Sequence, residues 1–431
     1  MSRFLIATMP AAGHVHPAVP VATALIARGH QVVWHTGPEY AAAVRGTGAT
    51  FVPARRTPSF TDLPAEPDPG TRGPAAGVCA LRKLLVDRMA GQLADYQEIL
   101  AEHPADAVIV DLCCLGGRAL HERLGTPWAT LGISPLTLMS PDTPPFGTGR
   151  PPPAGPLGRA RIRIHNRLGV LVMRGLTTAY TRQRADLGLP PLPRGITLFD
   201  HMSSPMLHLQ AATPSIEYPR RPWPGNVHLV GPLLPEAPPS PDLPDWWAEL
   251  DGARTVVHVT QGTVAADPAT LIRPTLEALA DLDGLVVVTH PTDVGPLPGN
   301  ARLARYVPHT VLLPRVHAMV SNGGYNGAKA ALAHGVPLVL APWGNDQPDV
   351  AARMSWAGAG IDLRVRTPSP ADVATAVHAV LTDDRYRRNA ARIRAEFARY
   401  PGGERAAVLL ERLAAGDSVE VPVHGFHDPL H

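Results

Sequence analysis

Short, continuously apolar segments alternate along the chain with segments whose apolar residues recur at helical spacing. We predict strands in the first half at Phe4–Met9, Gln31–Thr36, Ala107–Leu112, Trp128–Ile133 and Met206–Gln210. In the second half we predict them at Asn226–Gly231, Thr255–Thr260, Leu285–His290, Ala318–Ser321, Pro337–Ala341 and Gly360–Leu363. Helices such as Ala18–Arg28, Arg118–Leu124, Pro268–Leu282 and Pro348–Ala357 are expected between them. Apolar strands separated by helices indicate parallel sheets covered on both faces, and hence an α/β fold.

The strand–helix pattern runs twice, which predicts two doubly wound, Rossmann-like domains facing a cleft. The 431 residues, 45% of them hydrophobic, are also too many for one ordinary core. We predict a first domain at 1–213, a proline-rich linker at 214–244, a second domain at 245–415 and a tail at 416–431. The last helix of the second domain is a candidate for crossing back to the first. Ligands of such sheets bind beyond the carboxyl ends of the strands, so the loops there are the places to search.

Composition narrows the class of protein. With 18% charged residues, a net charge of +2 and no basic block, the chain has no nucleic-acid-binding footprint. Arg161, Arg163 and Arg167 form a small basic cluster, which a solvated helix face explains better than an anionic partner. Three cysteines cannot form a disulfide framework, and we find neither a signal peptide nor an integral membrane segment. These features predict a soluble, cytoplasmic protein.

The loop after the first strand, MPAAGHVHP at Met9–Pro17, carries the first candidate chemistry. Its one glycine is too few for a dinucleotide-binding turn. His14 could take a proton from a hydroxyl near neutral pH, although structural capping is an equal alternative for a lone histidine, and His16 is a weaker candidate base. Asp111 ends another strand and would lie on the same rim, where a carboxylate can orient a histidine. For Asp111 by itself, a cap or turn is the better interpretation.

A second loop, SNGGYNG at Ser321–Gly327, lies between an apolar run and the expected helix Ala328–His334. Paired glycines before a helix let the backbone approach a ligand closely, often a phosphate. Phosphate sites usually carry a positive charge as well, and this loop has none. Backbone amides and the neutral side chain of Asn322 would therefore have to hold the ligand.

The span Asn322–Gln347 resembles the donor-binding signature of UDP-glycosyltransferases, which are inverting enzymes with two facing Rossmann-like domains (the GT-B fold). The matching residues fall at the family spacing without a gap: Gly323, Gly324, Tyr325, Asn326, Gly335, Val336, Pro337, Pro342, Asp346 and Gln347. Four further stretches are similar to the family, namely Val307–His309, Leu312–Pro314, Val259–Thr263 and Gly13–Pro17. In the last of these His14 matches the family's base, and Asp111 lies where its partner aspartate is expected.

The resemblance implies a bacterial natural-product glycosyltransferase that moves a sugar from a nucleotide-sugar to a hydroxyl of a small, largely apolar aglycone. His14, oriented by Asp111, would deprotonate that hydroxyl, and direct displacement would invert the anomeric carbon. The first domain would bind the acceptor and the second the donor. The implied donor-binding residues are Gly262, Thr263, Tyr306, His309, Asn322, Gly323, Gly324, Asn326, Gly327, Asp346 and Gln347.

Some of these roles have structural alternatives. Asp346 and Gln347 suit neighbouring sugar hydroxyls, whereas Asp346 alone could be a helix N-cap before Pro348. Tyr306 would stack on the nucleobase, and a partly buried core tyrosine is nearly as good an explanation. No metal or other cofactor is expected if amides carry the phosphate charge. The expected partners are small molecules, and a homodimer or an auxiliary protein remains open.

The chain departs from the family pattern at several positions of the donor site. Asn322 replaces a histidine, Gly327 a serine or threonine, His309 a glutamine, and Ala330 a ribose-binding glutamate. The last change favours dTDP-sugars slightly, with UDP-sugars still open. One alternative function is therefore a non-catalytic or auxiliary homologue that binds a nucleotide or glycoside without turnover. An epimerase or phosphorylase with the same fold is a weaker alternative function, because His14 and Asp346 argue against it.

Overall fold

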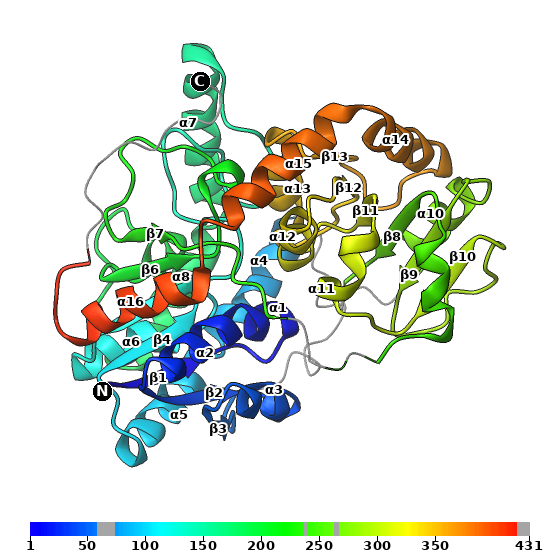
Figure 1. Ribbon diagram of the computed structural model, residues 1–431. Helices are drawn as coiled ribbons and strands as arrows, with labels where there is room; N and C mark the ends of the chain where they lie inside the picture. Colours follow the sequence, from blue (N-terminus) through cyan, green and yellow to red (C-terminus); the bar gives the residue numbers. More distant parts are fainter. Residues whose placement is uncertain (58–73, 237–239, 241, 263–266, 420–431) are drawn as a thin grey trace.

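The computed structural model describes residues 1–57, 74–236, 240, 242–262 and 267–419. Within these residues the strands form two sheets, and every neighbouring pair of strands is parallel. The first sheet has the order β3-β2-β1-β4-β5-β6-β7 and the second the order β10-β9-β8-β11-β12-β13. Figure 1 shows the two sheets in separate halves of the molecule, each flanked by helices. The two parallel α/β domains confirm the predicted GT-B architecture.

The strands of the first sheet are β1 (Arg3–Ala7), β2 (Gln31–Thr36), β3 (Thr50–Pro53), β4 (Ala107–Asp111), β5 (Trp128–Gly132), β6 (Leu207–Gln210) and β7 (Val227–Leu229). Its helices are α1 (Ala12–Val15), α2 (Val19–Ala27), α3 (Ala41–Gly46), α4 (Pro74–Leu81), α5 (Met89–Glu102), α6 (Gly116–Leu124), α7 (Gly155–Val172), α8 (Arg174–Asp186) and α9 (Leu198–His201). Successive side chains of a strand point to opposite faces. Phe4 of β1 accordingly belongs to the same core cluster as Leu25 of α2, and the next residue, Leu5, belongs with Leu93 of α5 to a different cluster.

The second sheet contains β8 (Val256–Thr260), β9 (Leu285–Thr289), β10 (Ala301–Ala304), β11 (Ala318–Ser321), β12 (Leu338–Leu340) and β13 (Gly360–Asp362). The helices that follow β8 are α10 (Ile272–Ala278), α11 (His309–Leu312), α12 (Tyr325–Ala333), α13 (Gln347–Trp356), α14 (Pro370–Thr382), α15 (Asp384–Phe397) and α16 (Gly402–Ala414). Val257 belongs to the same core cluster as Ile272, and Val256 belongs with Met319 and Leu332 to a different cluster.

Helix α16 lies on the first domain although it follows the second in sequence (Figure 1). Its residues Ala407 and Leu410 are buried in the same core cluster as Leu25 of α2. At the rim, Arg28 pairs with Glu411 at 2.7 Å between Nη2 and Oε2. An apolar stripe along α16 thus completes the core on one face of the first sheet.

Strand β7 corrects one prediction. We assigned Asn226–Gly231 to the second half and to the linker 214–244, but Val227–Leu229 pairs with β6 at the edge of the first sheet. The segment between β6 and β7 is long enough to cross over and return in parallel, so apolar character alone could not tell which sheet the strand joins. The strands β3 and β10 were not predicted at all, because both are short and only partly buried.

The crossover between β6 and β7 packs against the second domain. Its residues Ala212 and Ile216 are buried in the core cluster that also contains Val350 and Met354 of α13. Next to them, Glu217 accepts hydrogen bonds from Nη2 and Nε of Arg353 at 2.7 and 3.0 Å. A buried ion pair therefore connects the two halves of the molecule.

Candidate active site

His14 and Asp111 lie together at the carboxyl edge of the first sheet. His14 is in the short helix α1 after β1, and Asp111 is the last residue of the neighbouring strand β4. The His14 Nδ1 atom lies 3.2 Å from Asp111 Oδ2. The Asp111 carboxylate is buried and also accepts the backbone N–H groups of Met9 at 2.5 Å and Cys113 at 2.7 Å. These donors fix the carboxylate, so it can orient the imidazole ring.

Cys113 completes a small cluster with the same two residues. Potential ligand atoms of His14, Asp111 and Cys113 all lie within 4.8 Å of one another, a grouping that the sequence did not suggest. Burial and the charge of Asp111 raise the pKa of the Cys113 thiol well above its usual value. The Asp111 carboxylate of this cluster is the one that accepts the backbone N–H groups of Met9 and Cys113. The cluster therefore adds a thiol to the His14–Asp111 pair, in which Nδ1 and Oδ2 lie 3.2 Å apart.

The glycine loop of the second domain faces this pair. Gly323 has a positive φ of 86°, which favours glycine, and Gly324 is the N-cap residue of α12. A Cβ atom at Gly323 would lie 3.3 Å from the backbone oxygen of Gln347, so the loop also lies close to the start of α13. From the first turn of α12, Asn326 Nδ2 donates to the backbone oxygen of Gly13 at 3.1 Å. This hydrogen bond joins the loop to the residue before His14.

Asn322 is tied into the protein rather than projecting from the loop. Its side chain is buried, and Nδ2 donates to the backbone oxygen of Gln261 at 2.6 Å. Gln261 in turn accepts the backbone N–H groups of Leu271 and Ile272 through Oε1, at the start of α10. Asn322 and Gln261 thus form one network, which connects the ends of β11 and β8 with α10.

Asp346 and Gln347 lie at the start of α13. Asp346 occupies the N-cap position, but its side chain makes no capping hydrogen bond, which argues against the N-cap alternative. Burial raises the pKa of Asp346 to about 6, while the nearby basic side chains of His14, Lys329 and Arg353 act in the opposite direction. Gln347 uses Oε1 to accept the backbone N–H of Trp343 at 3.2 Å. The Asp346 carboxylate is therefore close enough to His14 for their charges to interact across the two domains.

The remaining predicted donor residues surround the loop. His309 begins α11, and its ring packs edge-on against His258, with centroids 5.6 Å apart. Burial lowers the pKa of His309 to about 4, which keeps it neutral near pH 7. A Cβ atom at Gly327 would lie 3.7 Å from this ring. Tyr306 is 70% exposed, so it is not the partly buried core tyrosine that was the alternative to stacking on a nucleobase. Gly262 follows β8 beside Asn322, and Thr263 lies outside the described residues.

Sequence reasoning missed Lys329, a fully buried cation one turn into α12. Its Nζ atom lies 4.3 Å from the ring centroid of Tyr325 and donates to the backbone oxygen of Ala211 at 3.3 Å, after β6 of the first domain. Burial lowers its pKa to about 7. A single lysine within an apolar helical segment was the signal that could have identified it.

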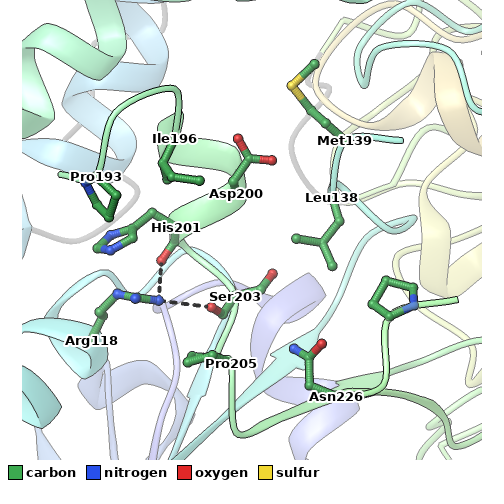
Figure 2. Close-up of a pocket in the computed structure, with 11 residues that line it drawn as sticks. Arg118, Leu138, Met139, Pro193, Ile196, Asp200, His201, Ser203, Pro205 and Asn226 are labelled. Carbon is green, nitrogen blue, oxygen red and sulfur yellow. Dashed lines mark hydrogen bonds between the residues drawn. The ribbon is translucent and has the colours of Figure 1, made fainter. Parts of the chain in front are cut away.

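A separate cavity of about 460 Å³ lies at the other edge of the first sheet (Figure 2). Ser203 and Pro205 on its wall precede β6, and Asn226 precedes β7. Arg118 holds this wall by donating to the backbone oxygens of His201 and Ser203, at 3.1 and 3.3 Å. None of the predicted site residues lines this cavity.

The fold and the site together define a class of protein: two facing α/β domains, with a histidine–aspartate pair on one and a glycine loop before a helix on the other. Residues 273–413 match the family model described as Erythromycin biosynthesis protein CIII-like, C-terminal domain. The chain is 42% identical over 420 residues to 4'-demethylrebeccamycin synthase of Lentzea aerocolonigenes, covering 96% of this chain and 99% of that protein. The chain belongs to the UDP-glycosyltransferase-like family and is a glycosyltransferase of the natural-product type.

Other relatives agree with this assignment. The chain is 33% identical over 445 residues to UDP-glycosyltransferase 2 of Phaeomoniella chlamydospora, covering 95% of each protein. Among solved structures, the glycotransferase of kitacinnamycin has a TM-score of 0.73 at 23% identity, covering 96% of this chain and 98% of that chain. The calicheamicin glycosyltransferase has a TM-score of 0.71 at 22% identity, with the same coverage. These structures share the GT-B fold.

Proposed function

We propose that the protein transfers a sugar from a dTDP- or UDP-sugar to a hydroxyl of a small, largely apolar natural product, with inversion at the anomeric carbon. The observation that supports this most is the position of His14, which is held by Asp111 and faces the donor loop and Asp346 across the two domains. Membership of the family favours a catalytic protein over the non-catalytic alternative. The solved structure of the glycosyltransferase VinC in complex with dTDP, which has a similar fold, is consistent with the donor class.

In this mechanism His14 takes the proton of the acceptor hydroxyl as the oxygen attacks the anomeric carbon. Asp111 stabilises the protonated imidazole and holds the ring in position. The bond to the nucleoside diphosphate breaks on the opposite face of the sugar. Backbone amides at Gly324–Gly327 and the positive end of the α12 dipole stabilise the departing diphosphate, and no metal is required. Asp346 and Gln347 bind the sugar hydroxyls, and Tyr306 stacks on the base.

The acceptor pocket is expected among the loops of the first domain, and the enzyme is expected to work in the cytoplasm. A homodimer or an auxiliary protein is compatible with this function and is not needed for the proposed chemistry. Alanine in place of the ribose-binding glutamate at position 330 leaves dTDP-sugars as the first donors to test.

The test is a transfer assay with dTDP-glucose and UDP-glucose and a panel of apolar hydroxylated aglycones, in which glycosides are detected by mass spectrometry. We expect an inverted anomeric configuration by NMR. The His14→Ala variant should turn over about 10²–10⁴-fold more slowly, the usual contribution of a general base. Its affinity for the nucleoside diphosphate should stay within a few-fold in calorimetry, which serves as the folding control. Retention of configuration, or near-normal turnover by His14→Ala, would rule out the mechanism.

A further inference from the structure

Helix α7 is attached to the molecule by one side only. Of its residues only Ile162 is buried, and on the same side Asn166 Nδ2 donates to the backbone oxygen of Ser140 at 2.8 Å. Figure 1 shows α7 projecting from the first domain, away from both sheets. Most of the helix surface is therefore in contact with solvent.

The exposed side of α7 is apolar. Leu157, Ile164, Leu168 and Leu171 are 88%, 58%, 52% and 62% exposed. Their spacing of seven, four and three residues places them on one face of the helix, the pattern that normally faces a core. Single exposed apolar residues are common on protein surfaces, whereas a continuous row of them indicates a surface that binds something.

In the sequence, the charged residues of α7 and of the segments next to it all have one sign. Residues 143–185 contain no aspartate or glutamate, and their arginines are Arg150, Arg159, Arg161, Arg163, Arg167, Arg174, Arg182 and Arg184. Arg184 pairs with Glu122 at 2.8 Å, but within the described part of the chain no carboxylate is paired with the arginines of α7. In a protein with a net charge of only +2, this region is strongly basic.

We propose that α7 docks the protein onto an anionic lipid surface, with Leu157, Ile164 and Leu168 inserted among the headgroups. The arginines at 161, 163 and 167 would contact the lipid phosphates. The sequence alone favoured a solvated face for these arginines, and the exposed apolar row between them changes that interpretation. A second copy of the chain is a poorer occupant because it would bring two arginine-rich helices together. Docking would be peripheral, since no described helix is long and apolar enough to cross a bilayer.

The chain leading to α7 passes the predicted active site. It leaves the carboxyl end of β5, the strand next to β4, and Gly147 then donates its N–H to Asp349 Oδ2 of α13 at 2.6 Å. Docking through α7 would therefore hold this side of the predicted active site near the bilayer, where apolar molecules accumulate. That consequence rests on the proposed function, whereas lipid binding itself does not.

The test is flotation of the full-length protein with phosphatidylcholine vesicles, with and without phosphatidylglycerol. We expect binding only to the anionic vesicles, and weaker binding as salt is added. Arg163→Gln/Arg167→Gln should reduce partitioning about 30-fold, since each basic residue near an anionic surface contributes about fivefold. The matched control is Arg388→Gln/Arg399→Gln, which removes two exposed arginines elsewhere and should bind like wild type.

A second pair of variants tests the apolar row. Ile164→Ser/Leu168→Ser should lose binding to anionic vesicles, whereas Leu297→Ser/Val408→Ser, which also changes two exposed apolar residues, should keep it. Because the four positions are exposed, Tm and nucleotide binding should be unchanged in all variants. The proposal fails if wild type does not float with anionic vesicles, or if it binds neutral vesicles equally well. It also fails if Ile164→Ser/Leu168→Ser instead dissociates a wild-type dimer, or abolishes binding of an acidic protein in the absence of lipid.

Discussion

At the scale of single residues, burial decides what the charged groups of the site can do. Asp346 has few polar partners and a pKa raised to about 6, whereas Asp111 is held by two backbone N–H groups. Two carboxylates, one on each domain, thus have different environments. Asp111 is suited to hold the imidazole of His14, and Asp346 is suited to accept hydrogen bonds from a ligand.

The residue-scale prediction concerns Asp346. Asp346→Ala should weaken binding of the nucleotide-sugar about 10- to 150-fold, because a hydrogen bond to a charged group contributes about 1.5–3 kcal/mol. Binding of the free nucleoside diphosphate should change far less. In wild type, binding of the nucleotide-sugar relative to the free nucleoside diphosphate should strengthen as pH rises through about 6. The pKa of Asp346 in the folded protein lies there, and its ionised form accepts the hydrogen bonds. Calorimetric titration of both ligands measures this, and equal weakening of the two would remove Asp346 from the sugar site.

At the scale of elements, the donor loop depends on how the ends of β8 and β11 are joined. Asn322 at the end of β11 donates to Gln261 at the end of β8, and Gln261 satisfies two N–H groups at the start of α10. The neutral side chains of Asn322 and Gln261 make these hydrogen bonds in a buried place. A charged side chain there would also need a counter-ion. The position of Asn322 is thus explained by the loop's own structure.

We therefore expect Asn322→Ala to act mainly on stability. Removing the amide leaves the buried Gln261 carbonyl without this donor, which costs about 1–3 kcal/mol of unfolding free energy. Urea unfolding measures that loss, and dTDP affinity in folded protein should fall by less than threefold. Asn300→Ala is the matched control. The side-chain amide of Asn300 also donates to backbone oxygens, those of Leu279 and Leu282, but Asn300 lies outside the predicted site. Unchanged stability with a tenfold loss of dTDP affinity would instead make Asn322 a direct phosphate ligand.

At the scale of the whole molecule, buried polar contacts fix how the two domains face each other. The Glu217 side chain is fully buried and accepts from Arg353 of α13, and its other oxygen accepts the N–H of Leu136 at 2.9 Å. Arg353 also lies over the ring of Tyr218, 4.1 Å from its centroid. The crossover, the segment after β5 and the helix behind Asp346 are thereby held together.

Arg353→Met should destabilise the protein by about 3–5 kcal/mol, because it leaves Glu217 buried without its counter-charge. Arg353→Met/Glu217→Gln should recover part of that loss. The control is Arg302→Met, which breaks the exposed pair with Glu249 at 2.6 Å and should cost less than about 1 kcal/mol. Guanidinium unfolding of the four proteins gives the comparison. A double variant as unstable as Arg353→Met would show that the stacking of Arg353 on Tyr218, and not charge compensation, stabilises the interface.

The sequence by itself determined the class of fold and most of its strands. Eleven runs were predicted as strands, and β2, for example, begins and ends at the predicted residues Gln31 and Thr36. Buried parallel strands are continuously apolar, so their pattern is visible without any tertiary information. The residues that carry the resemblance to UDP-glycosyltransferases are also visible in the sequence alone, because His14, the glycine loop and Asp346 follow strands at fixed spacing.

Only the tertiary structure decided what depends on contacts between distant residues. It placed β7 in the first sheet, returned α16 to the first domain, and paired Glu217 with Arg353 across a separation of 136 residues. It also showed Asn322 bonded inward and Lys329 buried, and it left the apolar side of α7 exposed. Local patterns record whether a side chain can be buried but not which partner buries it, because burial and pairing free energies arise from neighbours that the fold brings together.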